Sequence, residues 1–546
     1  MAKSSLPIWL ACWALAVASG IVFRPPLPVD ETRYLAVAWE MWYRGDFIVP
    51  YLNGEPYHHK PPLLFWLMTA GWSVFGVNEW WPRLVAPLFA LATLWGSVRL
   101  ATLLWPDDTN TPQLAPLLLV GTAFWSIFQT LTMFDMMLAA FTIAGIVGVV
   151  TAWRKGGWSG WLLVAFAIGL GVLAKGPAIL LHILPVALLA PWWGPKLPSG
   201  PDQPLISWKQ WYFRLFIAFL IGAAIALAWA IPAGINGGEE YRNMIFWGQS
   251  AGRIVKSFDH ARPFWWYLAV IPPLLLPWLL WPQLWRTLRS ALDFSDGAFR
   301  LLIAWVIPAV FVFSLISGKQ LHYLLPEFAA FALLFARGLS AHTEAAVSKF
   351  GRAMLASFFA ILCMLLLAFP HFSDLLSNPQ RFELLAPYWG GALSIMVLLI
   401  WFLGGRSVAS AIKVVAVSMA GLILVTHLVA KEKLDKTYDL RPIAAALKEY
   451  EDQGYALANF GNYHGQYQFM GRLKTPMAQL GLDFDETNAY IDATPKGVVV
   501  AYYYRNRMPD FPDDATPLAE FRFRDFNVKF WSIDLLRKYR NLGNRS

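Results

Sequence analysis

Acidic, basic and phenolic side chains that could do chemistry gather directly after the first apolar run of the chain. Asp30 and Glu31 are followed by Arg33 and Tyr34, so four groups that can hold or move charge lie within five positions. Asp30 could instead begin a helix, with Glu31 in its first turn, where carboxylates are favoured. That alternative explains one acid, but it does not explain the cation and the phenol beside it.

A second cluster lies in the stretch GEPYHHKPPLLFW, residues 54 to 66. Tyr57, His58, His59 and Lys60 immediately precede a double proline, which forces an extended entry into a following helix. One interpretation is a solvated loop with a lysine whose stem covers apolar surface. The other is a rigidly held group of lysine and histidine at a membrane surface, which suits a phosphate.

Further clusters of the same kind interrupt the later apolar runs: Asp135; Lys175; Asp259, His260 and Arg262; and Lys319, His322 and Tyr323. Each has a plain alternative, because Asp135 could cap a helix and Lys175 could be an ordinary turn residue. A single histidine is usually structural. Two histidines and a carboxylate can bind a divalent cation such as zinc, so His59 and His260 are candidate metal ligands, although no spacing specifies a metal.

The composition determines what kind of protein carries these clusters. Of 546 residues, 57% are hydrophobic and only 14% are charged, whereas ordinary soluble domains carry about 25% charge. A soluble protein of this composition could not cover its surface, so we expect a polytopic α-helical membrane protein. The net charge of +9 is not evidence for nucleic acid, because basic residues gather in cytoplasmic loops of membrane proteins. Cys12 and Cys363 form no disulfide framework.

The apolar runs predict about 13 transmembrane helices, since each is long enough to cross a bilayer core of roughly 30 Å. Residues 1–20 resemble a cleaved signal peptide, but the run continues to residue 23 and favours an uncleaved first span. The runs lie at about 7–23, 83–104, 114–130, 136–152, 159–174, 177–193, 211–234, 266–285, 299–316, 323–339, 353–370, 387–403 and 411–430.

Basic residues at alternate connections predict which loops stay in the cytoplasm. These residues are Arg154, Lys155, Lys196, Lys209, Arg214, Arg286, Arg289, Arg300, Arg337, Lys349, Arg352, Arg406 and Lys413. With the N-terminus also cytoplasmic, an odd number of spans places the C-terminus outside. All the polar clusters then fall on the outer side of the membrane, which favours one outer site.

The outer side also receives the parts of the chain that are not apolar. Residues 431–546 are richer in charge and contain β-rich runs such as 497–504, so we expect a small soluble α/β domain after a transmembrane domain of residues 1–430. Within the outer loop 24–82, residues 31–44 have apolar and aromatic positions at helical spacing. They predict an amphipathic helix lying on the outer membrane surface.

The order of these motifs resembles a known family. The stretches DETRYLAVAWEMWYRGDFIVPYLNGEPYHHKPPLLFW, LTMFDMML, LAKGPAILL, HARPFWWYL and GKQLHYLLP follow the pattern of glycosyltransferases of the type C membrane fold that use polyprenyl-phosphate sugars. They look most like the bacterial lipid A 4-amino-4-deoxy-L-arabinose transferases, relatives of the protein O-mannosyltransferases. The family often has Glu where this chain has His59. The stretch after residue 430 carries no matching motif.

The resemblance implies a bacterial inner-membrane enzyme with a periplasmic active site, an undecaprenyl-phosphate-linked sugar donor and a lipid A acceptor. It implies acidic catalytic residues at Asp30, Glu31 and Asp135, and a basic residue at Lys60. We expect the leaving phosphate of the donor to be bound by cations and phenols, namely Arg33, Tyr34, Tyr57, Lys60, Lys175 and Tyr323.

Two other functions remain open at this point. A protein O-mannosyltransferase would use a similar donor but a hydroxyl acceptor, which needs a general base. A transporter or lipid flippase would also handle lipid phosphates. Transporters usually place binding groups near the membrane midplane on broken helices in paired halves, and this sequence shows neither paired halves nor acids in the middle of its spans.

Overall fold

A computed structural model describes residues 7–197, 207–247, 261–372, 387–481, 484–504 and 515–539. The chain forms two compact units. Unit 1 consists of Met1–Phe23, His58–Leu64 and Asn78–Val429, and unit 2 consists of Arg24–Tyr57, Phe65–Val77 and Ala430–Ser546. Each unit therefore combines segments that are far apart in the sequence.

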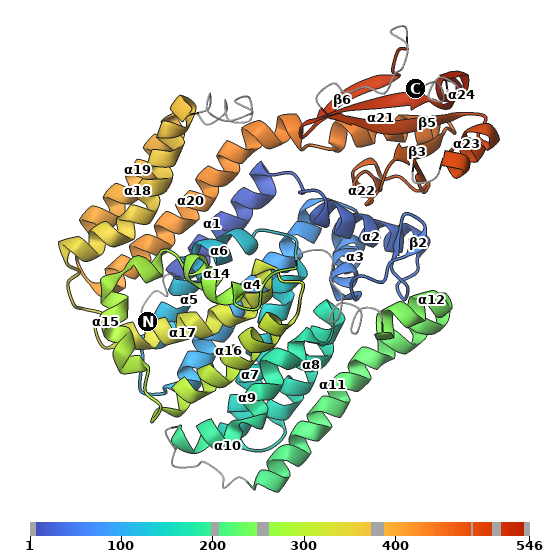
Figure 1. Cartoon of the computed structure of the whole chain (residues 1–546). Helices are drawn as coiled ribbons and strands as arrows, with labels where there is room; N and C mark the ends of the chain where they lie inside the picture. The colour runs from blue at the N-terminus through green and yellow to red at the C-terminus, as the bar shows by residue number, and fades with distance from the viewer. Residues whose placement is uncertain are drawn as a thin grey trace. The chain divides into compact units, whose positions relative to one another are not determined.

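The elements of unit 1 in its described part are helices joined by loops (Figure 1). Its elements are α1 (Ile8–Phe23), α4 (Trp80–Leu104), α5 (Thr111–Val120), α6 (Ala123–Phe128), α7 (Phe134–Lys155), α8 (Ser159–Lys175), η1 (Gly176–Ala178), α9 (Ile179–Leu188), α10 (Ala190–Trp193), η2 (Gly194–Lys196), α11 (Trp208–Asn236), α12 (Gly238–Asn243), α14 (Trp266–Leu274), η4 (Trp278–Leu280), α15 (Pro282–Ala291), α16 (Gly297–Leu315), η5 (Leu321–Glu327), α17 (Phe328–Ser340), α18 (Lys349–Phe372), α19 (Pro387–Leu403) and α20 (Val408–Thr437), whose last residues belong to unit 2.

Seven helical stretches in the described part of the chain are long and apolar enough to cross a membrane. They confirm the expected α-helical membrane fold but not the expected number of about 13 spans. Three of the expected runs correspond to shorter helices of 10–17 residues, and the expected runs 159–174 and 177–193 form one of the seven stretches. The seven stretches are Trp80–Leu104, Phe134–Lys155, Ser159–Leu188, Trp208–Asn236, Gly297–Leu315, Leu321–Ser340 and Val408–Lys431.

Glycines allow α7, α8 and α9 to pack closely. A Cβ atom on Gly160 of α8 would lie 2.4 Å from the backbone of α7, and one on Gly171 would lie 2.5 Å from Ile179 of α9. One on Gly145 of α7 would meet Ile183 of α9 and Ala167 of α8. Residues on either side of position 175 therefore lie opposite each other, so Ser159–Leu188 is a helical hairpin that reverses at Lys175 and Gly176. Small residues are a common way to bring membrane helices together.

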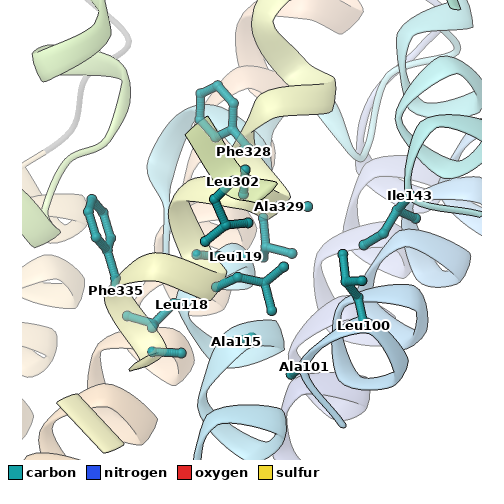
Figure 2. Packing of buried hydrophobic residues seen from close by; sticks show 14 of the residues in the cluster. Leu100, Ala101, Ala115, Leu118, Leu119, Ile143, Leu302, Phe328, Ala329 and Phe335 are labelled. Carbon is teal, nitrogen blue, oxygen red and sulfur yellow. The ribbon is translucent and has the colours of Figure 1, made fainter. Parts of the chain in front are cut away.

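The interior of unit 1 is one large apolar cluster. Figure 2 shows Leu100 and Ala101 of α4, Leu118 and Leu119 of α5, Ile143 of α7, Leu302 of α16 and Phe328 of α17 gathered within it. These helices come from well separated parts of the sequence. The cluster includes residues of α7, α8 and η5, so these elements pack against one another through it.

Unit 2 contains a five-stranded sheet of order β4-β3-β5-β7-β6. β3 pairs in parallel with β4 and β5, whereas β7 pairs antiparallel with β5 and β6. The elements of the unit are α2 (Asp30–Arg44), β1 (Tyr51–Leu52), β2 (Glu55–Pro56), most of α3 (Leu63–Phe75), α21 (Arg441–Asp452), β3 (Ala456–Phe460), α22 (Gln468–Gly471), β4 (Ala478–Leu480), α23 (Phe484–Ala493), β5 (Gly497–Tyr504), β6 (Ala519–Phe523), β7 (Phe526–Ser532) and α24 (Ile533–Tyr539).

Alternation along β5 explains why both faces of this sheet are covered. Val498 and Val500 belong to one apolar cluster with residues of α21, whereas Val499 and Ala501 belong to another with residues of α23 and α24. Side chains of a strand point to opposite faces in turn, so a strand that is apolar at every position must be buried on both sides. This part of unit 2 has the α/β character expected for residues 431–546.

The boundary between the units differs from the division expected at residue 430. The indole N–H of Trp39 in α2 donates to the carbonyl of Leu473 at 2.8 Å, and the ring of Trp72 stacks on that of Phe469 at 5.2 Å. The side chain of Asn53 accepts from the backbone N–H of Met477 at 2.7 Å. These contacts join segments of residues 24–77 to the C-terminal part of the chain in one unit.

The helix expected over residues 31–44 is α2, but its surroundings differ from those of a helix lying in a membrane surface. Leu35, Ala36, Val37 and Ala38 are all fully buried, and these four consecutive residues point to every side of the helix. Along this stretch α2 is therefore enclosed by protein. An apolar face exposed to lipid requires exposed apolar residues on one side, which this stretch does not have.

We expect Gly160→Ala to destabilise the protein, because the added methyl group would meet backbone atoms of α7 that cannot move independently. Overpacking of this kind costs about 1–3 kcal/mol. The measurement is the thermal unfolding temperature in detergent. Gly391→Ala is the matched control, because an added Cβ there meets nothing within 4 Å. Equal unfolding temperatures for the two variants would contradict the close packing of α7 and α8.

Candidate functional site

Asp135 is the centre of a charged group in unit 1. It is the second residue of α7, after the N-cap residue Met133, so it does not occupy the capping position that was its plain alternative. Its carboxylate is 2% exposed and accepts a hydrogen bond from the ammonium group of Lys175. The Nε2 atom of His322 lies 3.9 Å from the same oxygen. A buried carboxylate needs such partners to remain charged.

The hairpin and η5 bring these partners to Asp135. Lys175 ends α8, where Gly176 has a φ of +77°, a conformation that suits a residue without a Cβ. His322 and Tyr323 lie in the first turn of η5. The ammonium of Lys175 lies 4.8 Å from the centre of the Tyr323 ring, within the range of a cation–π interaction.

The segment before the double proline adds more cationic character to the same group. The ammonium group of Lys60 lies 5.7 Å from the centre of the Phe134 ring. Phe134 directly precedes Asp135, and Lys60 also interacts electrostatically with Asp135. The rings of His58 and His59 lie against each other with centroids 4.4 Å apart. Because Pro61 and Pro62 restrict the backbone, this segment holds Lys60 in one place.

A cavity of about 210 Å³ lies among these residues, all of them in unit 1. Its polar lining comes from His58, His59, Lys60, Lys175 and Tyr323. The rest of its wall is mainly apolar and includes Leu138, Trp229, Ile245 and Phe313. Two lysines and no carboxylate line this cavity, so it suits an anionic group that carries an apolar chain or ring.

Asp30 belongs to a second charged group, which lies in unit 2. It is the first residue of α2, and the N-cap residue is Val29, so Asp30 is not the helix cap either. Its carboxylate pairs with Arg33, and the hydroxyl of Tyr34 donates to it at 3.4 Å. Half of the Asp30 side chain remains exposed, so its carboxylate is accessible.

Arg33 is kept cationic by its neighbours. Burial lowers its pKa, but Tyr57, Asp30 and Tyr34 act in the opposite direction and the net result is a raised pKa. The rings of Tyr34 and Tyr57 both lie near that of Phe65, with centroids 6.4 Å and 6.2 Å from the Phe65 centroid, respectively. The phenols and the guanidinium predicted to bind phosphate are therefore neighbours, and they lie beside Asp30.

Glu31 is placed differently from its neighbour Asp30. It is 2% exposed, and its two carboxylate oxygens accept hydrogen bonds from the two terminal nitrogens of Arg24, one of them at 3.1 Å. The backbone N–H of Leu27 also donates to it at 2.8 Å. Glu31 thus clamps the turn before α2. The catalytic role that the resemblance implies for Glu31 stays a prediction.

His464 is a neighbour of Asp30 and Arg33 that the sequence did not reveal. Partial loss of water lowers its pKa, and Arg33 lowers it further, against an opposing effect of Asp30. The loop that carries it lies on α2, since a Cβ on Gly465 would be 2.9 Å from Ala36. Only the unusual composition of GNYHGQYQ, residues 461 to 468, could have drawn attention to it.

The predicted site residues thus fall into two groups, each within one unit. Lys60, Asp135, Lys175 and Tyr323 lie together in unit 1 with His59. The structure also brings together Asp30, Glu31, Arg33, Tyr34 and Tyr57 in unit 2. That both groups serve one reaction remains a prediction.

The predicted metal ligands do not form a metal site in the described part of the chain. No three His, Cys, Asp or Glu side chains there are grouped so that they could hold a metal ion. His59 adjoins Lys60 and Lys175 in the cavity, and these ammonium groups would repel a divalent cation. His260 lies outside the described residues. The cavity side chains fit an anion better than they fit zinc.

Comparisons with known proteins agree with the resemblance seen in the motifs. Residues 59–199 match the family model described as dolichyl-phosphate-mannose-protein mannosyltransferase. The chain is 28% identical over 372 residues to the undecaprenyl phosphate-alpha-4-amino-4-deoxy-L-arabinose arabinosyl transferase of Serratia proteamaculans. The match covers 65% of this chain and 64% of that protein. It is 32% identical over 361 residues to arabinosyl transferase 2 of Sodalis glossinidius, and this match covers 63% of this chain and 61% of that protein. These matches span less than two thirds of the relatives' length.

Two solved structures share the fold over almost the entire chain. They are crystal structures of ArnT from Cupriavidus metallidurans. The apo structure has a TM-score of 0.75 and covers 97% of this chain and 98% of that one. The structure with bound undecaprenyl phosphate has a TM-score of 0.72 and covers 96% of both chains. Each is 19% identical in sequence, so the similarity shown is one of fold. The expected type C membrane fold is confirmed at this level.

We expect His464 to make the stability of the folded protein depend on pH. Its pKa is lowered in the folded state, so below the ordinary histidine pKa of about 6.5 the unfolded chain binds more protons. Stability should therefore be lost as the pH falls below about 6.5 and be complete above it. The measurement is the unfolding temperature of wild type and His464→Gln across this range. Wild type should lose more stability than the variant.

Arg33→Gln is the companion variant for this prediction, because the guanidinium of Arg33 is one cause of the lowered pKa. It should recover part of the stability that wild type loses on acidification. Parallel pH profiles for wild type and His464→Gln would contradict the placement of His464 beside Arg33.

Proposed function

We propose that this protein is a membrane glycosyltransferase that moves 4-amino-4-deoxy-L-arabinose from undecaprenyl phosphate to a phosphate group of lipid A. The observation that carries the proposal is the cavity lined by Lys60, Lys175 and Tyr323 with an otherwise apolar wall. The relatives named above are arabinosyl transferases for undecaprenyl phosphate-aminoarabinose. The shared fold with ArnT supports the same assignment.

The reaction requires stabilisation of a leaving phosphate. The bond between the anomeric carbon and the phosphate oxygen of the donor breaks, and a new bond forms from that carbon to a phosphate oxygen of lipid A. Undecaprenyl phosphate leaves with the electron pair and an additional negative charge. Lys60 and Lys175 are placed to bind that charge, and one such interaction in a water-poor site contributes about 3–4 kcal/mol to the transition state.

The acceptor determines what the acids must do. A lipid A phosphate is already anionic at neutral pH, so it does not need a strong base to remove a proton. In this reaction Asp30 would stabilise positive charge on the sugar, either on the ring as the donor bond breaks or on the amino group. Asp135 has another task, because its carboxylate is occupied by Lys175 and holds that cation at the cavity. Arg33, Tyr34 and Tyr57 remain proposed binding groups for phosphate.

The proposal places the protein in the bacterial inner membrane with its site on the periplasmic side. The N-terminus would then be cytoplasmic and residues 431–546 periplasmic, as the positions of the basic loops predict. Both substrates would keep their tails in the lipid and their phosphates at the interface. Adding a cationic sugar lowers the negative charge of lipid A and would favour resistance to polymyxin and other cationic peptides.

One alternative acceptor is supported by the match of residues 59–199 to the protein mannosyltransferase family model. A hydroxyl acceptor needs a general base, and Asp30 is accessible enough to serve as one. A transporter or flippase is a further alternative, and it would move lipid-linked sugar without making a new glycosidic bond.

The test of the proposed function is transfer by purified protein between purified lipids, followed by mass spectrometry of lipid A. An increase in mass by one aminoarabinose unit supports the proposal. Labelled serine or threonine peptides in the same assay identify a protein glycosyltransferase. Movement of the donor across vesicle membranes without any mass increase identifies a flippase.

We expect Asp30→Asn to abolish the mass increase of lipid A while donor binding and folding largely remain. The amide is close in shape to the carboxylate but cannot stabilise a positive charge. Donor binding is measured with labelled undecaprenyl-phosphate sugar, and folding by thermal unfolding. Asp46→Asn in the same unit is the control. Turnover near the wild-type level in Asp30→Asn would remove Asp30 from the reaction.

We expect Lys60→Ala to weaken donor binding and to reduce the rate by roughly a hundred-fold or more, because the leaving phosphate loses one cation. The measurements are the dissociation constant of the labelled donor and kcat with lipid A. Lys413→Ala is the control, since Lys413 is an exposed lysine on α20 that does not line the cavity. An unchanged rate in Lys60→Ala would show that this lysine does not contact the leaving group.

A further inference from the structure

A second ionisable pair lies inside unit 1, outside the group around Asp135. The Nδ1 atom of His182 on α9 lies 2.5 Å from a carboxylate oxygen of Glu327 at the end of η5. Both side chains are fully buried, at 0% exposure. The Nε2 atom of His182 and the other oxygen of Glu327 have no hydrogen-bond partner among the residues that the structure describes.

Such a pair needs an explanation other than stability. Buried charged or polar pairs can often be replaced by apolar residues without loss of stability, because removing them from water costs about as much as their attraction gains. Ionisable residues inside membrane proteins are rare for the same reason, and they mark functional positions. Ile183 and Phe328, which are next to the pair in the sequence, belong to the large apolar cluster of unit 1.

The pair connects two segments that form the wall of the cavity. His182 lies in the first turn of α9. This helix directly follows Lys175, Gly176, Pro177 and Ala178, all of which line the cavity. Glu327 ends the 3-10 helix η5, whose first turn contains His322 and Tyr323. One hydrogen bond therefore joins the segment that carries Lys175 to the segment that carries its partner Tyr323.

Phe313 links the pair to the cavity more directly. Its ring centroid lies 5.7 Å from that of His182 and 5.8 Å from that of Tyr323, and Phe313 itself lines the cavity. His182 thus lies behind the wall, one side chain away from the enclosed space. It is too deeply buried to contact a ligand in the cavity.

We propose that His182 and Glu327 are positioning residues, whose mutual hydrogen bond fixes Lys175 and Tyr323 relative to each other and so shapes the binding site for the phosphate of the lipid-linked substrate. The proposal rests on the proposed function, because it assigns the cavity to that phosphate. A hydrogen bond has a direction and a length, so it fixes the register of α9 and η5 more tightly than apolar contacts do.

The expected consequence of losing the bond is a misplaced cation rather than an unfolded protein. Lys175 must stay within reach of both Asp135 and Tyr323 to face the cavity. Displacement by about 1 Å of a group that orients a substrate can cost up to about a hundred-fold in rate. The main effect should be on binding of the phosphate and on KM for the donor.

The experiment uses the full-length protein in detergent with three variants of the pair. His182→Phe with Glu327→Leu replaces it by apolar side chains, Glu327→Gln removes the charge but keeps a hydrogen-bonding group, and His182→Glu with Glu327→His exchanges the partners. Trp193→Phe is the control, because it removes a 2.8 Å hydrogen bond from the indole to Val186 at the other end of α9. KM and kcat for the donor, the dissociation constant of labelled undecaprenyl phosphate, and the unfolding temperature are measured for each.

The proposal predicts that the apolar double variant unfolds within a few degrees of wild type but has a donor KM raised at least about ten-fold. Glu327→Gln should retain most of the affinity, and the exchanged pair should recover part of it. Trp193→Phe should leave KM unchanged. If the apolar double variant has the same KM and the same affinity for undecaprenyl phosphate as wild type, the proposal is overturned. If that variant does not fold, the single variant Glu327→Leu, which also removes the hydrogen bond, takes its place, and a wild-type KM and phosphate affinity in it would overturn the proposal.

Measuring the dissociation constant of undecaprenyl phosphate separates this proposal from the proposed function. If wild type binds undecaprenyl phosphate but transfers no aminoarabinose, the proposed function fails while the positioning role is still read from the dissociation constants. If wild type binds no undecaprenyl phosphate, the assignment of the cavity is wrong and the positioning proposal fails with it.

Discussion

A carboxylate removed from water must have a cation beside it, and this requirement governs the arrangement around Asp135. The effective cost of burying one unpaired charge is several kcal/mol even after the protein relaxes. Asp135 meets the requirement through Lys175, with His322 nearby. Lys175 is the last residue of α8, which packs closely on α7, so this packing brings its ammonium group to Asp135. Lys175 also lines the cavity.

Sequence patterns were sufficient for the parts of this structure that follow from local chemistry. Apolar runs predicted a membrane protein, and helical spacing predicted α2. The polar clusters between the runs included Lys60, Asp135, Lys175 and Tyr323, which the structure places around one cavity or beside it. The order of the motifs, rather than any one of them, supported the resemblance to glycosyltransferases of the type C fold. The structural comparison confirms the fold.

Other features could not be predicted because they depend on partners far away in the sequence. Nothing near Glu31 indicates that it pairs with Arg24 while Asp30, the next residue, remains accessible. His182 and Glu327 are 145 residues apart, and each is a single polar residue in an apolar run. The count of about 13 spans is not confirmed, for a related reason. Apolar composition identifies helices that avoid water, but it does not distinguish full spans from shorter helices packed inside the protein.

The pairing of Lys175 with Asp135 has a consequence for turnover. Under the proposed reaction the donor carries a phosphodiester with a single negative charge, whereas the departing lipid carries a phosphate monoester with a charge of about −1.5 to −2. A cavity with two uncompensated lysines would hold the spent carrier lipid more firmly than a fresh donor, and the enzyme would stall. Asp135 neutralises part of that attraction through Lys175. Under the proposed reaction, the same carboxylate that keeps the cation in place would therefore also ease the exit of the spent carrier.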